Sequence, residues 1–333
     1  MSVSVNTEPG NETLSESTCN PLPVLALRIR CRFDGAAPTA THAGEMWRGA
    51  IKNGLREQSA DLLAALFEPE RHRAPPGGGA GITNSQTPGL ALCAHDPRAP
   101  SIAAASDPVE QWLDLTFFGA AAPLAAPVLY GLMAQAERGV GDRALHFSME
   151  EILVRAVDGL WSPWRLPARS ADISPVAKLA AGPSVETDRD AGYAELALVL
   201  TSRLRLVVNG ALLTKPPPLP VLVEALVSRV NRLGIIWGDG PPVNATQSLE
   251  LATAAGLAVE VTGNRARTVR RWVTSGRQQS RYPGGGLSGT LVYRLPGNAM
   301  SLLEPLLALG EWTQLGQQTT AGAGQYRLFL PER

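Results

Sequence analysis

The chain has 333 residues, of which 44% are hydrophobic and 5% aromatic, and its 30 Lys and Arg residues balance its 30 Asp and Glu residues. This composition is typical of a soluble globular protein of about two domains. It contains no apolar run of about 18 residues. Its first residues are polar and acidic where a secretory signal would be basic and then apolar, so we expect neither a membrane protein nor a secreted one.

The three cysteines, Cys19, Cys31 and Cys93, include no CxxC pair. They are too few for a disulfide framework or for a zinc site built from four thiolates. We therefore expect a reducing, cytoplasmic compartment and predict no metal site.

The net charge of zero hides an uneven distribution. Residues 192–333 hold 13 arginines and one lysine against eight acidic residues, a net charge of +6, so residues 1–191 carry −6. The stretch 261–303 contains seven arginines and no acidic residue. A GC-rich coding sequence would produce part of this arginine bias. Because guanidinium binds phosphate in a bidentate manner and stacks on bases, the basic half is predicted to face nucleic acid.

In the first half, strict alternation of apolar and basic residues predicts a strand, and apolar spacings near three and four predict helices. The order is that of a small α+β sheet covered on one face. The predicted elements, in chain order, are a disordered tail (1–20), a strand (Pro23–Phe33), a helix broken near Ser59 (Glu45–Phe67), a mobile loop (72–85) in a longer Ala- and Pro-rich insert (72–108), a strand (Val109–Phe118), a helix opening at Pro127, and a strand through Leu145, Phe147 and Met149.

Residues 156–191 show little pattern and are predicted to form a linker or irregular insertion. The second half then gives strand, helix, strand, strand, helix, strand, which is the ferredoxin-like order. We therefore predict an α+β protein of two tandem ferredoxin-like (RRM-like) domains, at 21–155 and 192–333. The predicted elements of the second domain are a strand (Ala194–Val208), a helix (Leu219–Leu233), two short strands (Leu257–Val261 and Gly289–Leu295), a helix interrupted by Pro305 (Ala299–Leu309), a glycine-rich loop (Gly316–Gly324) and a final strand.

The glycine-rich loop is the most informative local feature. Gly316, Gly322 and Gly324 free the backbone to approach an anion, and the hydroxyls of Thr319 and Thr320 could hold phosphate oxygens. A tight helix-to-strand turn would need glycine for steric reasons alone. The loop is not a P-loop, since no GK[ST] follows it.

Several segments carry a family resemblance: VRRWVTSGRQQSRYPGGGLSGTLVYRL (269–295), LLEPLLALGEWTQLGQQTTAGAGQYRL (302–328), WRGAIKNGLR (47–56), AERGVGDRALHF (136–147), and the pair SRLRL and VEALVSRVNRLG. Together they resemble the CRISPR-associated endoribonucleases of the RAMP superfamily, which process precursor CRISPR RNA. The resemblance implies two ferredoxin-like domains facing a cleft, a glycine-rich loop on the repeat RNA, and metal-independent cleavage. It implies a crRNA stem-loop and other CRISPR effector subunits as partners, and no cofactor, membrane or small-molecule substrate.

Metal-free RNA cleavage needs a base for the attacking 2′-OH, an acid for the leaving 5′-oxygen and a cation for the phosphorane charge. Histidine suits both proton transfers. In the resembling family a histidine often lies between the first strand and the first helix, which is where His42 lies. His42 is therefore predicted as acid or base, with Arg48 or Lys52 as the phosphate stabiliser; the alternative is an ordinary loop histidine. His72 is predicted to lie in a solvated basic loop, and His95 and His146 to be structural.

The sequence departs from the family pattern at Gln317, where the family often has lysine. Some members lack a usable histidine and work with arginine, or do not cleave. If this chain is such a member, the candidates become Arg28 or Arg30, Arg48, and an arginine between 265 and 281.

The predicted RNA-binding residues are basic side chains on strands, helix faces and the acid-free stretch, together with the glycine-rich loop. The irregular spacing of the arginines in that stretch predicts a loop or hairpin that follows an RNA backbone. The full set is Arg28, Arg30, Arg56, Arg229, Arg265, Arg267, Arg270, Arg271, Arg277, Arg281, Gly316, Thr319, Thr320, Gly322 and Gly324.

Trp161 and Trp164 are open to two interpretations, stacking on bases or anchoring the linker, of which we favour the anchor. The other tryptophans in apolar patterns are predicted to be core residues: Trp47, Trp112, Trp237 and Trp312.

Two functions remain open. The first is an endoribonuclease that cleaves CRISPR repeat RNA near the base of its stem and stays on the product. The alternative is a non-catalytic subunit that caps the 3′ hairpin of the guide in an effector complex. A subunit that polymerises along the guide is disfavoured by the two-module layout.

Overall fold

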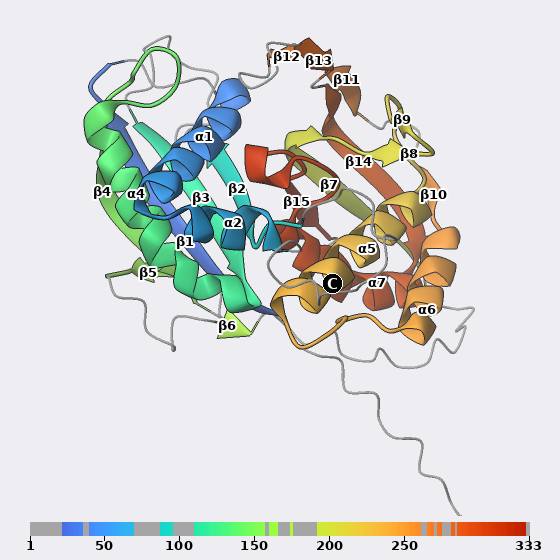
Figure 1. Cartoon of the computed structure of the whole chain (residues 1–333). Coiled ribbons are helices and arrows are strands. Elements are labelled where there is room, and N and C mark those ends of the chain that lie inside the picture. Colours follow the sequence, from blue (N-terminus) through green and yellow to red (C-terminus); the bar gives the residue numbers. More distant parts are fainter. Residues whose placement is uncertain are drawn as a thin grey trace, which may run out of the picture.

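The computed structural model describes residues 22–35, 40–69, 87–95, 110–156, 160–165, 174–175, 192–260, 265–269, 272–274, 281–283 and 285–330. Two antiparallel sheets lie in tandem, each covered by helices (Figure 1). The predicted tail 1–20 lies outside the described residues. None of the helices in the described part of the chain is long and apolar enough to span a membrane.

The first domain contains a sheet in the order β2-β3-β1-β4-β5, with β6 paired to β1. Alternation in β1 buries Leu25, Leu27 and Ile29 beneath the helices and leaves Arg28 and Arg30 on the open face of the sheet. The elements are β1 (Pro23–Phe33), α1 (Ala40–Gln58), α2 (Ala60–Phe67), β2 (Leu90–His95), β3 (Glu110–Phe118), η1 (Gly119–Leu124), α4 (Ala125–Arg138), β4 (Phe147–Arg155), β5 (Trp161–Pro163) and β6 (Ser174–Pro175).

The second domain contains a sheet in the order β10-β14-β7-β15, with β11 paired to β14 and two small hairpins beside it. The elements are β7 (Tyr193–Leu204), β8 (Val207–Val208), β9 (Ala211–Leu212), α5 (Leu219–Trp237), α6 (Ala245–Gly256), β10 (Val259–Glu260), β11 (Arg267–Val269), β12 (Trp272–Thr274), β13 (Arg281–Pro283), β14 (Gly286–Pro296), α7 (Gly297–Thr313), η3 (Thr319–Ala321) and β15 (Tyr326–Phe329).

In both sheets the first strand lies between the third and the fourth, and the second strand lies outside the third. This is the antiparallel ferredoxin-like arrangement, so the predicted tandem ferredoxin-like fold is confirmed. Each domain has its own apolar core between sheet and helices.

Four element predictions were wrong in part. Helix α1 begins at Ala40 instead of Glu45, so His42 lies in its first turn. The predicted insert at 72–108 contains strand β2, whose residues 90–94 are all buried and so show no alternation. Helix α6 was missed, although Asn244 and Gln247 form the capping box that opens it. Pro305 does not interrupt α7, because burial of its apolar face outweighs one lost backbone hydrogen bond.

The predicted linker is also more structured than expected, since β5 and β6 both pair with the first sheet. The last residue of α5, which belongs to the second domain, packs in the core of the first domain. Trp237 is 3% exposed within the first core, and its Nε1 donates to the Thr87 carbonyl at 3.0 Å. The two domains therefore share a buried seam.

Candidate nucleic-acid interface

The glycine-rich loop connects α7 to β15 through a closed turn. The Leu315 N–H donates to the Gly324 carbonyl at 2.8 Å, and Gly324 has φ 83°. A Cβ on Gly324 would lie 1.9 Å from the Leu315 carbonyl oxygen. Glycine is therefore required there for steric reasons, whatever the loop binds.

Many polar groups of the loop are engaged inside the protein. The N–H groups of Gln317 and Gly324 donate to the carbonyls of Arg205 and Arg203, both at 2.8 Å, and those of residues 321–323 donate within the loop. Thr319 and Thr320 are buried. Internal hydrogen bonds thus hold the loop in this conformation, and both threonines predicted to hold phosphate are buried.

The buried side chain of Arg229, in α5, stabilises the loop from inside the protein. Its Nε donates to the Thr313 carbonyl at 3.2 Å and its Nη2 to Thr319 Oγ1 at 3.0 Å. Burial, and then the nearby Arg232, lowers the pKa of Arg229 to about 10. Arg229, which was predicted to contact RNA, therefore stabilises the conformation of the loop.

The loop packs against the start of α1, which lies in the other domain. A Cβ on Gly44 would lie 2.3 Å from the Ala321 carbonyl oxygen. Helix α1 also carries His42, whose side chain lies outside the described residues. The structure thus brings together the two segments that the sequence singled out, although more than half the chain separates them.

An ion pair stabilises the contact between α1 and the glycine-rich loop. Arg203 of β7 donates through Nη2 to Glu45 Oε1 of α1 at 3.0 Å and to Gln318 Oε1 of the loop at 3.1 Å. The Arg203 side chain is only 10% exposed. One guanidinium therefore links helix α1, strand β7 and the loop.

The other basic residues of α1 differ in their suitability. An α-helix rises 1.5 Å per residue, which puts Arg48 about 9 Å and Lys52 about 15 Å from His42 along the axis. The Lys52 ammonium lies 4.8 Å above the ring of Phe67 in α2. Arg56 is exposed and donates to Asn53 at 2.9 Å. Along the helix, Arg48 is thus the nearer to His42 of the two predicted phosphate stabilisers.

Arg28 and Arg30 lie elsewhere, on the open face of the first sheet. Arg28 makes two 2.8 Å bonds to Asp114; burial opposes its charge, but this carboxylate outweighs burial and raises the pKa of Arg28. Arg30 is 3.5 Å from Glu151. Both are predicted RNA contacts that the structure does not bring to the start of α1.

The arginine-rich stretch forms short strands, as the expected hairpin requires. Arg265 and Arg267 are exposed beside β14, and Arg281 lies in β13, which pairs with β12. These strands project at the top of Figure 1, the end of the molecule where α1 begins. Arg270, Arg271 and Arg277 lie outside the described residues.

Of the other three histidines, the structure describes the side chain of His146 alone. His146 is exposed in front of β4, and His95 ends β2 with its side chain outside the described part. His72 lies outside the described residues altogether.

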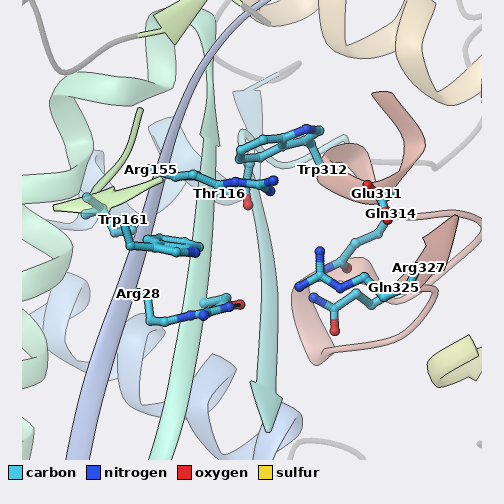
Figure 2. Close-up of a pocket in the computed structure, with 12 residues that line it drawn as sticks. Arg28, Thr116, Arg155, Trp161, Glu311, Trp312, Gln314, Gln325 and Arg327 are labelled. Carbon is cyan, nitrogen blue, oxygen red and sulfur yellow. Dashed lines mark hydrogen bonds and ion pairs between the residues drawn. The ribbon is translucent and has the colours of Figure 1, made fainter. Parts of the chain in front are cut away.

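A second feature, the interdomain pocket, was missed by sequence reasoning. Arg28, Arg155 and Trp161 of the first domain line it together with Trp312 and Arg327 of the second (Figure 2). Trp312 was predicted to be core, as was Trp112, but both are only half-buried; Trp47 and Trp237 are buried as predicted, and Trp164 is buried as an anchor. Two of its lining residues had been singled out in the sequence, Arg28 as an RNA contact and Trp161 as a residue open to two interpretations.

Comparison with known proteins agrees with the fold. A Cas6 product complex has a TM-score of 0.55 at 16% identity over 92% of this chain and 99% of that chain. Thermus thermophilus Cas6 has 0.53 at 15% over the same shares. A partial Cas6-RT-Cas1–Cas2 complex has 0.57 at 12% over 95% of this chain and 47% of that chain. No curated protein matches the sequence.

The class defined by fold and site is thus a tandem ferredoxin-like protein whose C-terminal glycine-rich loop packs on the first helix. Residues 198–326, most of the second domain, match the family model described as CRISPR-associated endoribonuclease Cas6. The predicted resemblance to the CRISPR-associated endoribonucleases is confirmed, by sequence in the second domain and by fold in both.

Proposed function

We propose that the protein is an endoribonuclease that binds CRISPR repeat RNA and cuts it without a metal ion to produce mature crRNA. The packing of the glycine-rich loop against Gly44, near the start of α1, carries this proposal. It joins the domain that matches the endoribonuclease family to the helix that holds His42.

In the reaction, a 2′-oxygen attacks the adjacent phosphorus and loses its proton to a base. The bond from phosphorus to the 5′-oxygen breaks, and an acid protonates that oxygen. The products are a 2′,3′-cyclic phosphate and a 5′-hydroxyl. His42 serves as acid or base, and Arg48 offsets the charge on the phosphorane.

The protein recognises the repeat stem-loop through phosphates and shape, since double-helical RNA offers little sequence information to side chains. Strand β11, which begins at the exposed Arg267, lies at the end of the molecule where α1 begins (Figure 1), and Arg267 with the exposed Arg265 suits this role. Cleavage near the base of the stem leaves these contacts in place, so the protein stays on the 3′ stem-loop and carries it into the effector complex.

The deciding experiment is incubation of the protein with repeat RNA from its own CRISPR locus in EDTA. A parallel reaction uses the same RNA with a 2′-deoxy substitution at the mapped cut site. We expect cleavage in EDTA and none of the 2′-deoxy RNA. Tight binding without cleavage would contradict the enzymatic proposal and favour the hairpin-capping subunit.

The ion pair between Arg203 and Glu45 gives a further prediction. Arg203→Gln and Glu45→Gln should each slow cleavage. Because both substitutions break the same contact, the double variant should raise the activation free energy by less than the sum of the two single increases, with a difference of about 0.5–3 kcal/mol. Rates under single-turnover conditions measure this. The exposed pair Arg138–Glu57, between α4 and α1, is the control, and its loss should leave the rate unchanged. Simple additivity of the Arg203 and Glu45 effects would show that the pair does not position α1.

A further inference from the structure

Two glutamines flank the glycine-rich loop, and both reach the first domain. Gln314 follows the last residue of α7, and Gln325 follows the last residue of the loop. Both side chains line the interdomain pocket (Figure 2). Gln314 Nε2 donates to the Leu92 carbonyl at 3.0 Å, and Gln325 Oε1 accepts from the Cys93 thiol. The two ends of the loop are therefore bonded to consecutive residues of β2.

The backbone of Gln314 has a conformation that glycine adopts far more easily. Its φ is 58° and its ψ is 160°. A residue with a side chain persists in this region only where the surrounding contacts hold it there. Gln314 is 3% exposed, and its Nε2 faces Leu92 because an amide oxygen there would oppose the carbonyl oxygen. The bond to Leu92 is thus what a glycine at this position would lack.

The carbonyl that Gln314 bonds lies on a sheet edge. Strand β2 is the outermost of the described strands on its side of the first sheet, and an edge strand turns alternate carbonyls away from its partner. The loop lies close to this edge. A Cβ on Gly322 would be 3.7 Å from the Leu92 carbonyl oxygen and 3.4 Å from Gly44 Cα in α1. The bond from Gln314 therefore holds the loop where it meets α1.

Gln325 uses the opposite end of its amide. Its Oε1 accepts from the Cys93 thiol and from Thr201 Oγ1 of β7, the latter at 3.0 Å. Burial, and then the nearby Asp114, raises the pKa of the Cys93 thiol, so the thiol keeps its proton and remains a donor. Gln325 thus joins β2 of the first sheet to β7 of the second.

From this geometry we propose that Gln314 and Gln325 are positioning residues for RNA cleavage, which hold the glycine-rich loop on β2 at the place where it meets the start of α1. The reaction that they serve rests on the proposed function. Their role is to set the position of the loop and not to transfer a proton. A loop displaced by about 1 Å would misalign the RNA with the groups on α1.

The first test uses the opposite polarity of the two hydrogen bonds. Gln314→Met and Gln325→Met keep the length of the side chain and lose the amide, so each should slow single-turnover cleavage about 10²-fold. The dissociation constant of the 2′-deoxy RNA should not change. Gln325→Glu keeps the acceptor and should restore cleavage, whereas Gln314→Glu has no donor for Leu92 and should not. Rescue by glutamate at both positions, or at neither, would overturn the assignment.

Gln58→Met is the matched control. Gln58 lies on α1, and its Nε2 donates to the Pro127 carbonyl of α4 at 2.8 Å, so it also joins two elements through a backbone carbonyl. Both of these elements belong to the first domain and neither is the loop. Gln58→Met should cleave at the wild-type rate. A loss as large as that of Gln314→Met would indicate general destabilisation and would contradict a specific role for the two glutamines.

A comparison of Gln314→Gly with Gln314→Ala separates positioning from stability. Both variants lack the amide, but only the alanine keeps the strained backbone. The glycine variant should therefore melt at the higher temperature. Both should cleave equally slowly. A glycine variant that recovers the wild-type rate would show that the backbone of residue 314, and not its amide, sets the position of the loop.

A further measurement is independent of RNA cleavage. In Gln314→Met, the backbone amides of residues 315–324 should exchange with deuterium about tenfold faster than in the wild type, the factor expected for the loss of one hydrogen bond. Gln58→Met should leave their exchange unchanged. Faster exchange in a protein that cuts no RNA would keep the two glutamines as the residues that hold the loop and overturn only the proposed function. Unchanged exchange in Gln314→Met would overturn the assignment even in an active enzyme.

Discussion

Replacing His42 by alanine is expected to slow RNA cleavage about 10²–10⁴-fold, the usual contribution of a positioned acid or base. Affinity for uncut RNA should change little, because phosphate contacts elsewhere dominate binding. Single-turnover cleavage rates, with dissociation constants measured on the 2′-deoxy RNA, separate the two effects.

His146 provides the control, since it is exposed in front of β4 and the structure does not bring it to the loop. His146→Ala should cleave at the wild-type rate. A His42→Ala protein that cleaves normally would move the chemistry to arginine. In that case Arg48, the nearer of the two predicted phosphate stabilisers to the start of α1, is the first residue to replace.

Replacing Gly44 by alanine is expected to slow cleavage about 10²-fold, a loss typical of a displacement near 1 Å in an active site. The added Cβ would lie 2.3 Å from the Ala321 carbonyl oxygen, a backbone atom that cannot turn aside. Helix α1 and the glycine-rich loop must therefore separate. The same overpacking should lower the free energy of unfolding by about 1–3 kcal/mol.

Gly49 gives a matched control on the same helix, because a Cβ there would meet nothing within 4 Å. Gly49→Ala should stabilise the protein by about 0.5–1 kcal/mol through helix propensity and leave cleavage unchanged. Thermal unfolding and single-turnover kinetics of the two variants test this difference. Equal cleavage rates would show that contact between α1 and the loop is not part of the active site.

Local pattern was most informative where one face of an element is buried and the other is not. Strand β1 was predicted at Pro23–Phe33 and is observed with those bounds, because strict alternation leaves no other register. The break near Ser59 is also confirmed, since its side chain caps α2 by accepting from the Asp61 N–H at 3.1 Å. Pattern failed at β2, whose residues 90–94 are all buried and show no period.

The candidate site shows the same limit. Glycine spacing and the family resemblance indicated the loop, and the basic stripe indicated α1. Neither signal shows how far apart the loop and α1 lie in the folded protein. Arg28 illustrates the difficulty: alternation correctly placed it on a basic strand face, while its partner Asp114 lies on β3, 86 positions along the chain. Local sequence cannot show whether such an arginine faces RNA or a carboxylate.

By itself, the sequence determined the tandem ferredoxin-like order, the basic second half, the glycine-rich loop and the resemblance to RNA-processing enzymes. These features depend on local periodicity, composition and motifs, which neighbouring residues specify. The tertiary structure alone decided that Gly44 meets Ala321, that Arg203 joins Glu45, and that Arg155 and Trp312 enclose a pocket. Those contacts depend on how two domains pack, and packing is decided by the shapes of surfaces assembled from distant parts of the chain.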